Sequence, residues 1–82
     1  MKPTQNLSEQ VRAIRKATGL TQEQFAAKLG VTFPTVNRWE NKKTVPSPLA
    51  LQNLEKLRKE LARKGVEIEP IAVGAESTHG VL

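Results

Sequence analysis

The sequence predicts an all-α protein, a compact bundle of about four helices followed by a short C-terminal tail. Three observations support this prediction. The chain has 82 residues, which is enough for one hydrophobic core and no more. Apolar residues recur at helical spacing through residues 7–64, and helix-start and helix-stop signals divide that pattern. Cysteine is absent, so neither a disulfide framework nor a thiolate metal site stabilises the chain.

The first two predicted helices span residues 7–18 and 22–29. Each begins with a capping box, in which a polar side chain and a Glu or Gln three residues later satisfy each other's backbone N–H groups, and each ends at a glycine. The capping pairs and their glycines are Asn6 with Glu9 and Gly19, and Thr21 with Gln24 and Gly30. The inward stripes of these helices are Leu7, Val11 and Ile14, and then Phe25, Ala26 and Leu29.

The third and fourth predicted helices span residues 33–41 and 48–64. A hydroxyl side chain precedes each helix, and a proline lies in each first turn, where its missing N–H has no intrahelical partner to lose. These residues are Thr32 with Pro34, and Ser47 with Pro48. The fourth segment contains no internal breaker before Gly65, so it predicts a single rod about 26 Å long. Its inward face consists of Ala50, Leu51, Leu54, Leu57 and Leu61.

The last part of the chain, residues 66–82, differs from the helical part. Residues 66–69 alternate apolar and acidic side chains as a strand does, and Pro70 interrupts the alternation. The chain end at residues 80–82 either pairs with this stretch as a small β-hairpin or stays unpaired. We therefore expect a helix-turn-helix domain over residues 1–65 and a separable tail, whose deletion leaves the helical fold intact.

Charge is distributed unevenly along the chain. Residues 1–46 contain eight basic and three acidic residues, residues 47–65 contain five and two, and the tail contains three glutamates and no basic residue. A basic body attracts polyanions such as nucleic-acid backbones, although a solvated basic surface has the same composition. With a single histidine, His79, and no cysteine, we expect no catalytic residues, no enzyme activity, no cofactor and no metal site.

The sequence contains no membrane-spanning or secretory signal. No window approaches 18 uninterrupted apolar residues, and residues 1–6 lack the apolar run of a secretory leader. We therefore expect a cytoplasmic protein that makes no contact with a membrane.

The second and third helices, joined by the four-residue connection 29–32, have the spacing of a helix-turn-helix unit. In such a unit the second helix enters the major groove of double-stranded DNA. At about 100° per residue, one side of residues 33–41 gathers Val36, Trp39 and Glu40. The other side carries side chains suited to base edges, because Arg fits guanine and Asn fits adenine. Its members are Pro34, Asn37, Arg38 and Asn41.

Residues 19–41, GLTQEQFAAKLGVTFPTVNRWEN, closely resemble the phage-repressor-like (Cro-like, XRE-type) helix-turn-helix family of prokaryotic regulators. With residues 46–48, the resemblance covers about half of the chain. It implies a lambda-repressor-like bundle in which the residues over the bases are Phe33, Pro34, Asn37 and Arg38. It implies phosphate contacts from Gln22, Asn41 and Lys43, and Thr32, Thr35 and Lys42 flank the same surface and are expected to reach phosphates too. It also implies an inward ion pair of Arg15 with Glu40; Gly30 and Trp39 are expected to be structural.

Several of these residues have a structural alternative. Gln22 is either a phosphate ligand or a polar first-turn residue, and Phe33 either meets a thymine methyl or caps the core. Trp39 lies on the inward side, so we expect it in the core rather than stacked on a base. Lys42 stands where many relatives carry glycine, so we expect the third helix to fray or to be capped by Asn41 in the left-handed conformation.

Two functions fit the sequence. The leading interpretation is a sequence-specific DNA-binding transcriptional regulator that works at the nucleoid as a homodimer on a two-fold operator, because one short recognition helix reads only a few base pairs. The alternative is an antitoxin-type protein, in which the tail over residues 66–82 binds a toxin as a protein partner while the helical part binds the operator of its own operon.

Overall fold

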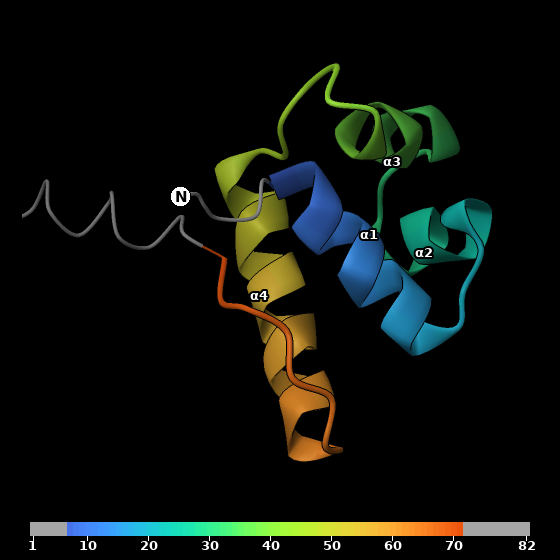
Figure 1. Cartoon of the computed structure of the whole chain (residues 1–82). Coiled ribbons are helices and arrows are strands. Elements are labelled where there is room, and N and C mark those ends of the chain that lie inside the picture. Colours follow the sequence, from blue (N-terminus) through green and yellow to red (C-terminus); the bar gives the residue numbers. More distant parts are fainter. Residues whose placement is uncertain (1–6, 72–82) are drawn as a thin grey trace, which may run out of the picture.

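The computed structural model describes residues 7–71, which form four helices (Figure 1). They are α1 (Leu7–Thr18), α2 (Gln22–Leu29), α3 (Phe33–Glu40) and α4 (Pro48–Arg63). The predicted all-α bundle is confirmed, and α4 is the expected single rod of 16 residues, about 24 Å long. α1 packs on both α3 and α4, while α2 packs mainly on α3 (Figure 1).

Local capping chemistry sets the helix starts. The backbone N–H of Gln24 donates to Thr21 Oγ1 at 3.1 Å, and the N–H of Thr21 donates to Gln24 Oε1 at 3.0 Å, so the predicted capping box is present. Thr32 and Ser47 cap α3 and α4, since the side chain of each accepts from the backbone N–H three residues later. The capping box expected at Asn6 lies outside the described residues.

Three helices end in the same hydrogen-bond pattern, in which a residue one or two positions past the helix has a positive φ and the next N–H donates to a carbonyl O five residues back. These residues are Gly30 (φ 76°), Lys42 (φ 63°) and Gly65 (φ 94°). After α3, the N–H of Lys43 donates to the carbonyl O of Arg38 at 2.9 Å, which closes the pattern. The expectation that Asn41 takes the left-handed conformation is wrong: its φ is −102°, and α3 ends at Glu40 with the strained position on Lys42.

One apolar core joins the helices. Its largest fully buried side chains, such as Phe25 and Leu54, each contribute about 1.5 to 3 kcal/mol by leaving water. The predicted inward residues of the helices are all buried or half-buried, so the predicted helix faces are confirmed. The buried apolar residues are Val11, Ile14, Phe25, Ala26, Val36, Trp39, Ala50, Leu54, Leu57, Leu61 and Ile71.

The last of these core residues, Ile71, belongs to a non-helical segment, residues 66–71, that runs back along α4 (Figure 1). We call this segment the strap. No strand forms anywhere in residues 7–71, so the strand expected over residues 66–69 is wrong, and its proposed pairing partner at residues 80–82 lies outside the described residues. Because Ile71 is only 7% exposed, the packed body extends past the boundary expected at residue 65.

Side chains, rather than a neighbouring strand, satisfy the backbone of the strap. From α1, Gln10 Nε2 donates to a strap carbonyl at 3.0 Å. From α4, Arg58 Nη1 donates to a second carbonyl at 3.2 Å, and Glu55 Oε1 accepts a strap N–H at 3.2 Å. The backbone partners are those of Pro70, Ile68 and Ile71, respectively. The strap therefore ties α1 to α4 at the face turned away from α3 (Figure 1).

Candidate nucleic-acid interface

α3 buries one side and leaves the other open. Val36 is fully buried, and Trp39 is 4% exposed, which confirms that the indole belongs to the core. The opposite side of α3 consists of exposed Pro34 and Arg38, half-buried Asn37, and Phe33, whose ring is 46% exposed. This exposure argues against the alternative in which Phe33 caps the core, and contact with a thymine methyl stays a prediction. α3 offers a mixed polar and apolar surface to a partner.

The threonines at the N-terminal end of α3 bond each other. The hydroxyls of Thr32 and Thr35 lie 2.9 Å apart, and the N–H of Thr35 also donates to Thr32 Oγ1 at 3.3 Å. The unpaired N–H groups of a first helical turn attract anions. At this end of α3, however, Pro34 has no N–H, and the N–H groups of Thr35 and Val36 donate to Thr32, so the cap holds the turn in shape and these donors are already used.

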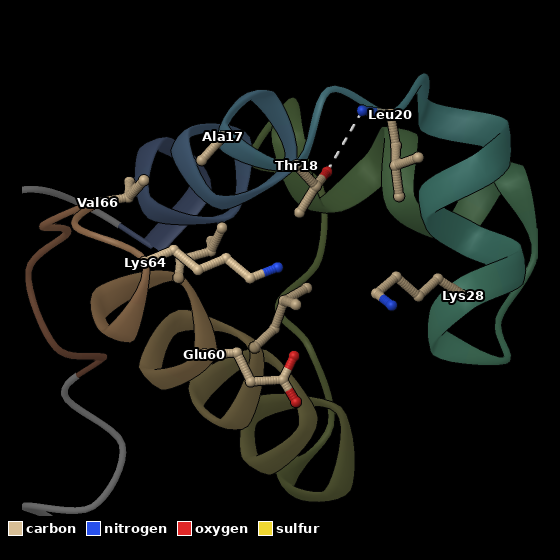
Figure 2. Close-up of a pocket in the computed structure, with 9 residues that line it drawn as sticks. Ala17, Thr18, Leu20, Lys28, Glu60, Lys64 and Val66 are labelled. Atoms are coloured by element: carbon tan, nitrogen blue, oxygen red, sulfur yellow. Dashed lines mark hydrogen bonds between the residues drawn. The ribbon is translucent and has the colours of Figure 1, made fainter.

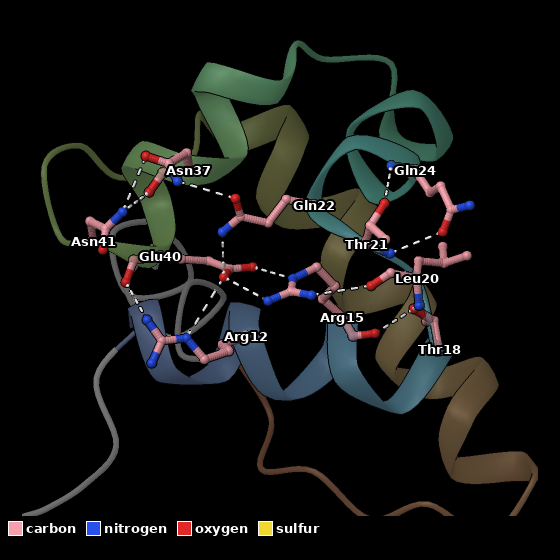
Figure 3. A network of polar contacts seen from close by, with 10 residues as sticks. All are labelled: Arg12, Arg15, Thr18, Leu20, Thr21, Gln22, Gln24, Asn37, Glu40 and Asn41. Atoms are coloured by element: carbon pink, nitrogen blue, oxygen red, sulfur yellow. Dashed lines mark hydrogen bonds and ion pairs between the residues drawn. The ribbon is translucent and has the colours of Figure 1, made fainter.

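A buried ion pair fixes the orientation of α3 (Figure 3). Arg15 Nε donates to Glu40 Oε2 at 2.7 Å, and Arg15 Nη2 donates to Glu40 Oε1 at 3.0 Å. The side chain of Glu40 is 2% exposed. A fork-to-fork pair of this kind gives direction as well as energy, so it locks the roll of α3 relative to α1. The inward pair expected from the resemblance is present.

Arg12 is a second partner of Glu40 that the sequence did not reveal. Its Nη2 donates to the carbonyl O of Glu40 at 3.0 Å, and its Nε lies 3.7 Å from Glu40 Oε1. Basic side chains near a helix C-terminus commonly bond the last carbonyls. The available signal was spacing, because Arg12 lies three residues before Arg15 and shares its face of α1.

These contacts set the ionisation of Glu40. Burial alone would raise its pKa, but hydrogen bonds from Arg15 and Gln22 and the charges of both arginines outweigh burial and hold the pKa below its usual value. The pKa of Arg15 is raised because its guanidinium bonds the carboxylate. Glu40 therefore remains a carboxylate, a group that only accepts hydrogen bonds.

The side chain of Gln22 lies between Glu40 and the open face of α3 (Figure 3). Its Nε2 donates to Glu40 Oε1 at 2.9 Å, and its Oε1 accepts from Asn37 Nδ2 at 3.1 Å. Asn37 Oδ1 in turn accepts from Asn41 Nδ2 at 3.2 Å. Three predicted contact residues from two helices are thus brought together in one row. Gln22 is more than a polar first-turn residue.

Basic side chains gather at the C-terminal end of α3. Arg38, Lys42 and Lys43 are all exposed, and none forms an ion pair within residues 7–71. The positive φ of Lys42 turns the chain there, and Lys42 borders a small pocket with Leu7 and Trp39. An anionic partner would find Arg38 on the open side of α3 and two exposed lysines just past the end of the helix.

A pocket of about 350 Å³ lies between α1, α2 and α4, and Lys28, Glu60 and Lys64 border it (Figure 2). It includes none of the predicted contact residues. Within residues 7–71, no three His, Cys, Asp or Glu side chains gather as a metal site would require. No helix among these residues has the length and apolar character to cross a bilayer.

The comparisons with known proteins agree with this geometry. A helix-turn-helix family model matches residues 11–59, more than half of the chain. The DNA-binding domain of the P22 c2 repressor, residues 1–76, is 32% identical. The match covers 70% of this chain and 74% of that one, with a TM-score of 0.62. No curated protein matches the chain. The chain therefore belongs to the phage-repressor-like helix-turn-helix family.

Proposed function

We propose that this protein is a sequence-specific DNA-binding transcriptional regulator that places α3 in the major groove. The observation that supports this best is the open side of α3, which carries Arg38 and Asn37 and is followed by Lys42 and Lys43, neither of which forms an ion pair within residues 7–71. Guanidinium and carboxamide groups bond base edges, whereas lysines bond phosphates. The P22 c2 repressor domain, 32% identical to this chain, is a DNA-binding domain.

The residues over the bases differ in what they offer. Arg38 carries the paired donors that fit O6 and N7 of guanine, and Asn37 carries the donor and acceptor that fit adenine. The half-exposed ring of Phe33 suits a thymine methyl. Pro34 has neither donor nor acceptor on its side chain, so it contributes through shape and apolar contact.

The phosphate contacts surround this surface. They come from Gln22, Thr32, Thr35, Asn41, Lys42 and Lys43. Gln22 keeps one N–H free after donating to Glu40, and that hydrogen can reach a phosphate oxygen. Asn41 points its nitrogen at Asn37, so its side chain donates to a phosphate only by giving up a bond to Asn37. The two lysines need no such exchange.

We further propose that the protein binds as a homodimer. A recognition helix of eight residues contacts few base pairs. Two copies spaced about 34 Å apart on a two-fold operator are the usual way to gain specificity. Such a regulator works in the cytoplasm, at the nucleoid.

Selection of bound duplexes from a random pool tests both proposals. A palindromic consensus with half-sites about one helical turn apart is the expected result. Recovery of an asymmetric consensus would leave DNA binding in place and overturn the homodimer. Recovery of no consensus would overturn sequence-specific binding.

Substitution of Arg38 tests the assignment to a base. Arg38→Ala should weaken operator binding by about 1 to 3 kcal/mol and relax the preference at one base pair. Arg63→Ala is the matched control, because Arg63 is an exposed arginine at the far end of α4. Equal losses on every duplex would reassign Arg38 to a phosphate.

A further inference from the structure

A one-way row of hydrogen bonds crosses the open face of α3 and ends on a buried carboxylate (Figure 3). Asn41 donates to Asn37, Asn37 donates to Gln22, and Gln22 donates to Glu40, at 3.2, 3.1 and 2.9 Å. The first three side chains are amides, each of which can both donate and accept. Only Glu40, at 2% side-chain exposure, lacks a donor.

The carboxylate determines the direction of the row at Gln22 and Asn37. At the other end Asn41 points the same way, because its Nδ2 also donates to the carbonyl O of Asn37 at 2.9 Å. Because Glu40 accepts only, Gln22 must present its nitrogen to it, and the oxygen of Gln22 then faces Asn37. Asn37 must in turn present its nitrogen to that oxygen. The bidentate grip of Arg15 keeps Glu40 in one position, so the starting point of the row does not move.

This direction limits what Asn37 has left for a ligand. One N–H of Nδ2 is used by Gln22, so a single N–H remains, together with a free lone pair on Oδ1. Adenine presents one acceptor, N7, and one donor, the N6 amino group, to the major groove. Guanine presents two acceptors, N7 and O6. Asn37 held in this way matches adenine, because its N–H meets N7 and its oxygen meets the N6 amino group. With guanine, the oxygen of Asn37 would face O6, and two acceptors repel each other.

We propose that Glu40 is a positioning residue for base recognition. Acting through Gln22, it fixes the carboxamide of Asn37 so that α3 selects adenine over guanine at the base pair that Asn37 meets. The inference rests on the proposed function, because it requires α3 in the major groove. Glu40 itself does not touch DNA.

The principal test is Gln22→Leu, which cuts the row and leaves the Arg15–Glu40 pair in place. Asn37 then regains its second N–H, and the bond from Asn41 is the one side-chain bond of the row that it keeps. In the wild type, adenine should be preferred over guanine at this base pair by about tenfold or more, and in the variant by about threefold or less. The readout is this ratio of dissociation constants on two duplexes that differ at one base pair. The loss of a phosphate contact cancels in the ratio, since such contacts carry no sequence information.

A matched control and a second variant complete the design. Gln52→Leu makes the same change at an exposed glutamine of α4 and should leave the ratio unchanged. As a single substitution, Glu40→Gln should lower the preference for adenine over guanine. Added to Gln22→Leu, it should lower this preference no further. If Glu40→Gln does not fold, the comparison of Gln22→Leu with Gln52→Leu still tests the proposal. A folded Gln22→Leu protein with the wild-type ratio would overturn the proposal.

A measurement without DNA separates this proposal from the proposed function. In ¹H–¹⁵N spectra, the side-chain amide signals of Asn37 and Asn41 should shift in Gln22→Leu and stay in place in Gln52→Leu. Unmoved signals would show that the row does not exist, even if the protein binds DNA. Shifted signals in a protein that binds no DNA would keep the row and overturn its role in base selection together with the proposed function.

Discussion

Two arginine–carboxylate pairs do different work in this molecule because their surroundings differ. Arg15 and Glu40 join α1 to α3, and the carboxylate is almost sealed from water, at 2% exposure. Arg58 and Glu55 are neighbours on α4, three residues apart, and the carboxylate is 23% exposed. Each pair also bonds a group of another segment: Glu40 accepts from the side-chain amide of Gln22 on α2, and Arg58 and Glu55 bond the backbone of the strap. The first pair orients α3, and the second holds the strap.

The difference in exposure sets the cost of losing each pair. Removing one partner of a buried pair leaves an uncompensated charge in the core, which typically costs about 3 to 5 kcal/mol. In a partly exposed pair, water takes over when a partner is lost, and the cost falls to about 1 kcal/mol. The comparison therefore makes quantitative predictions.

The largest effect is expected for Arg15→Met. It leaves the buried carboxylate of Glu40 with Gln22 and the more distant Arg12 alone, and should lower the free energy of unfolding by about 3 to 5 kcal/mol. Arg58→Met, the matched control, should cost about 1 kcal/mol. Urea denaturation followed by circular dichroism measures both. Similar losses for the two variants would break the comparison.

The next largest effect is expected for Ile71→Ala, which tests whether the strap belongs to the core. Ile71 is 7% exposed, so its truncation should cost about 2 to 4 kcal/mol. Ile68→Ala is the control, because Ile68 is only half-buried and should cost less. Thermal melting of the full chain provides the measurement. An unchanged melting temperature for Ile71→Ala would make the strap an attachment rather than part of the core.

Acid should weaken both pairs. The pKa values of Glu40 and Glu55 lie below the usual 4.5, that of Glu55 chiefly because Arg58 donates to it. A carboxyl whose folded pKa is lowered stabilises the protein above its unfolded pKa, and this contribution is lost as the pH falls through the folded value. The free energy of unfolding should therefore fall below about pH 4.5.

Glu55→Gln separates the two carboxylates in this acid range. The variant should lose about 1 kcal/mol at neutral pH and then decline less steeply than the wild type, because it retains one of the two carboxyls whose pKa is lowered, that of Glu40. Denaturation curves recorded from neutral pH to acid give the two slopes. Parallel slopes would mean that Glu55 contributes nothing to the pH dependence.

The smallest effect is expected for Lys42→Gly. Glycine holds the equivalent position after α2 and after α4, whereas Lys42 adopts φ 63° at a cost of about 1 to 2 kcal/mol. Lys42→Gly removes this cost, but glycine has more conformational freedom in the unfolded chain, which opposes part of the stabilisation. The net increase in the free energy of unfolding should be about 0.5 to 1 kcal/mol. A destabilised variant would show that the lysine side chain supports the end of α3.

The helices could be predicted from the sequence because their signals are local. Thr21, Thr32 and Ser47 each act within three residues, and periodicity alone separates the inward face of α3 from its open face. The Arg15–Glu40 pair needed the family resemblance, since its partners are 25 residues apart. No local pattern links them.

The strap could not be predicted either, because its partners are far away along the sequence. Gln10 meets Pro70 across 60 positions of the chain, and the alternation of residues 66–69 carries no information about which element will satisfy the backbone. Alternation indicates an extended chain with one buried face, and a strand needs a partner strand in addition. The row from Asn41 to Glu40 was hidden too, because the orientation of each amide depends on its neighbours.

Trp39 gives the protein its own optical reporter. It is the single tryptophan of a chain without tyrosine, and its indole is buried on the side of α3 that faces away from the proposed groove. Emission should therefore shift to the red when α3 leaves the core, yet escape quenching by stacked bases when duplex binds. Fluorescence that changes in step with ellipticity would mean one cooperative unit, whereas separate midpoints would mean that α3 leaves the core independently of the melting of the other helices.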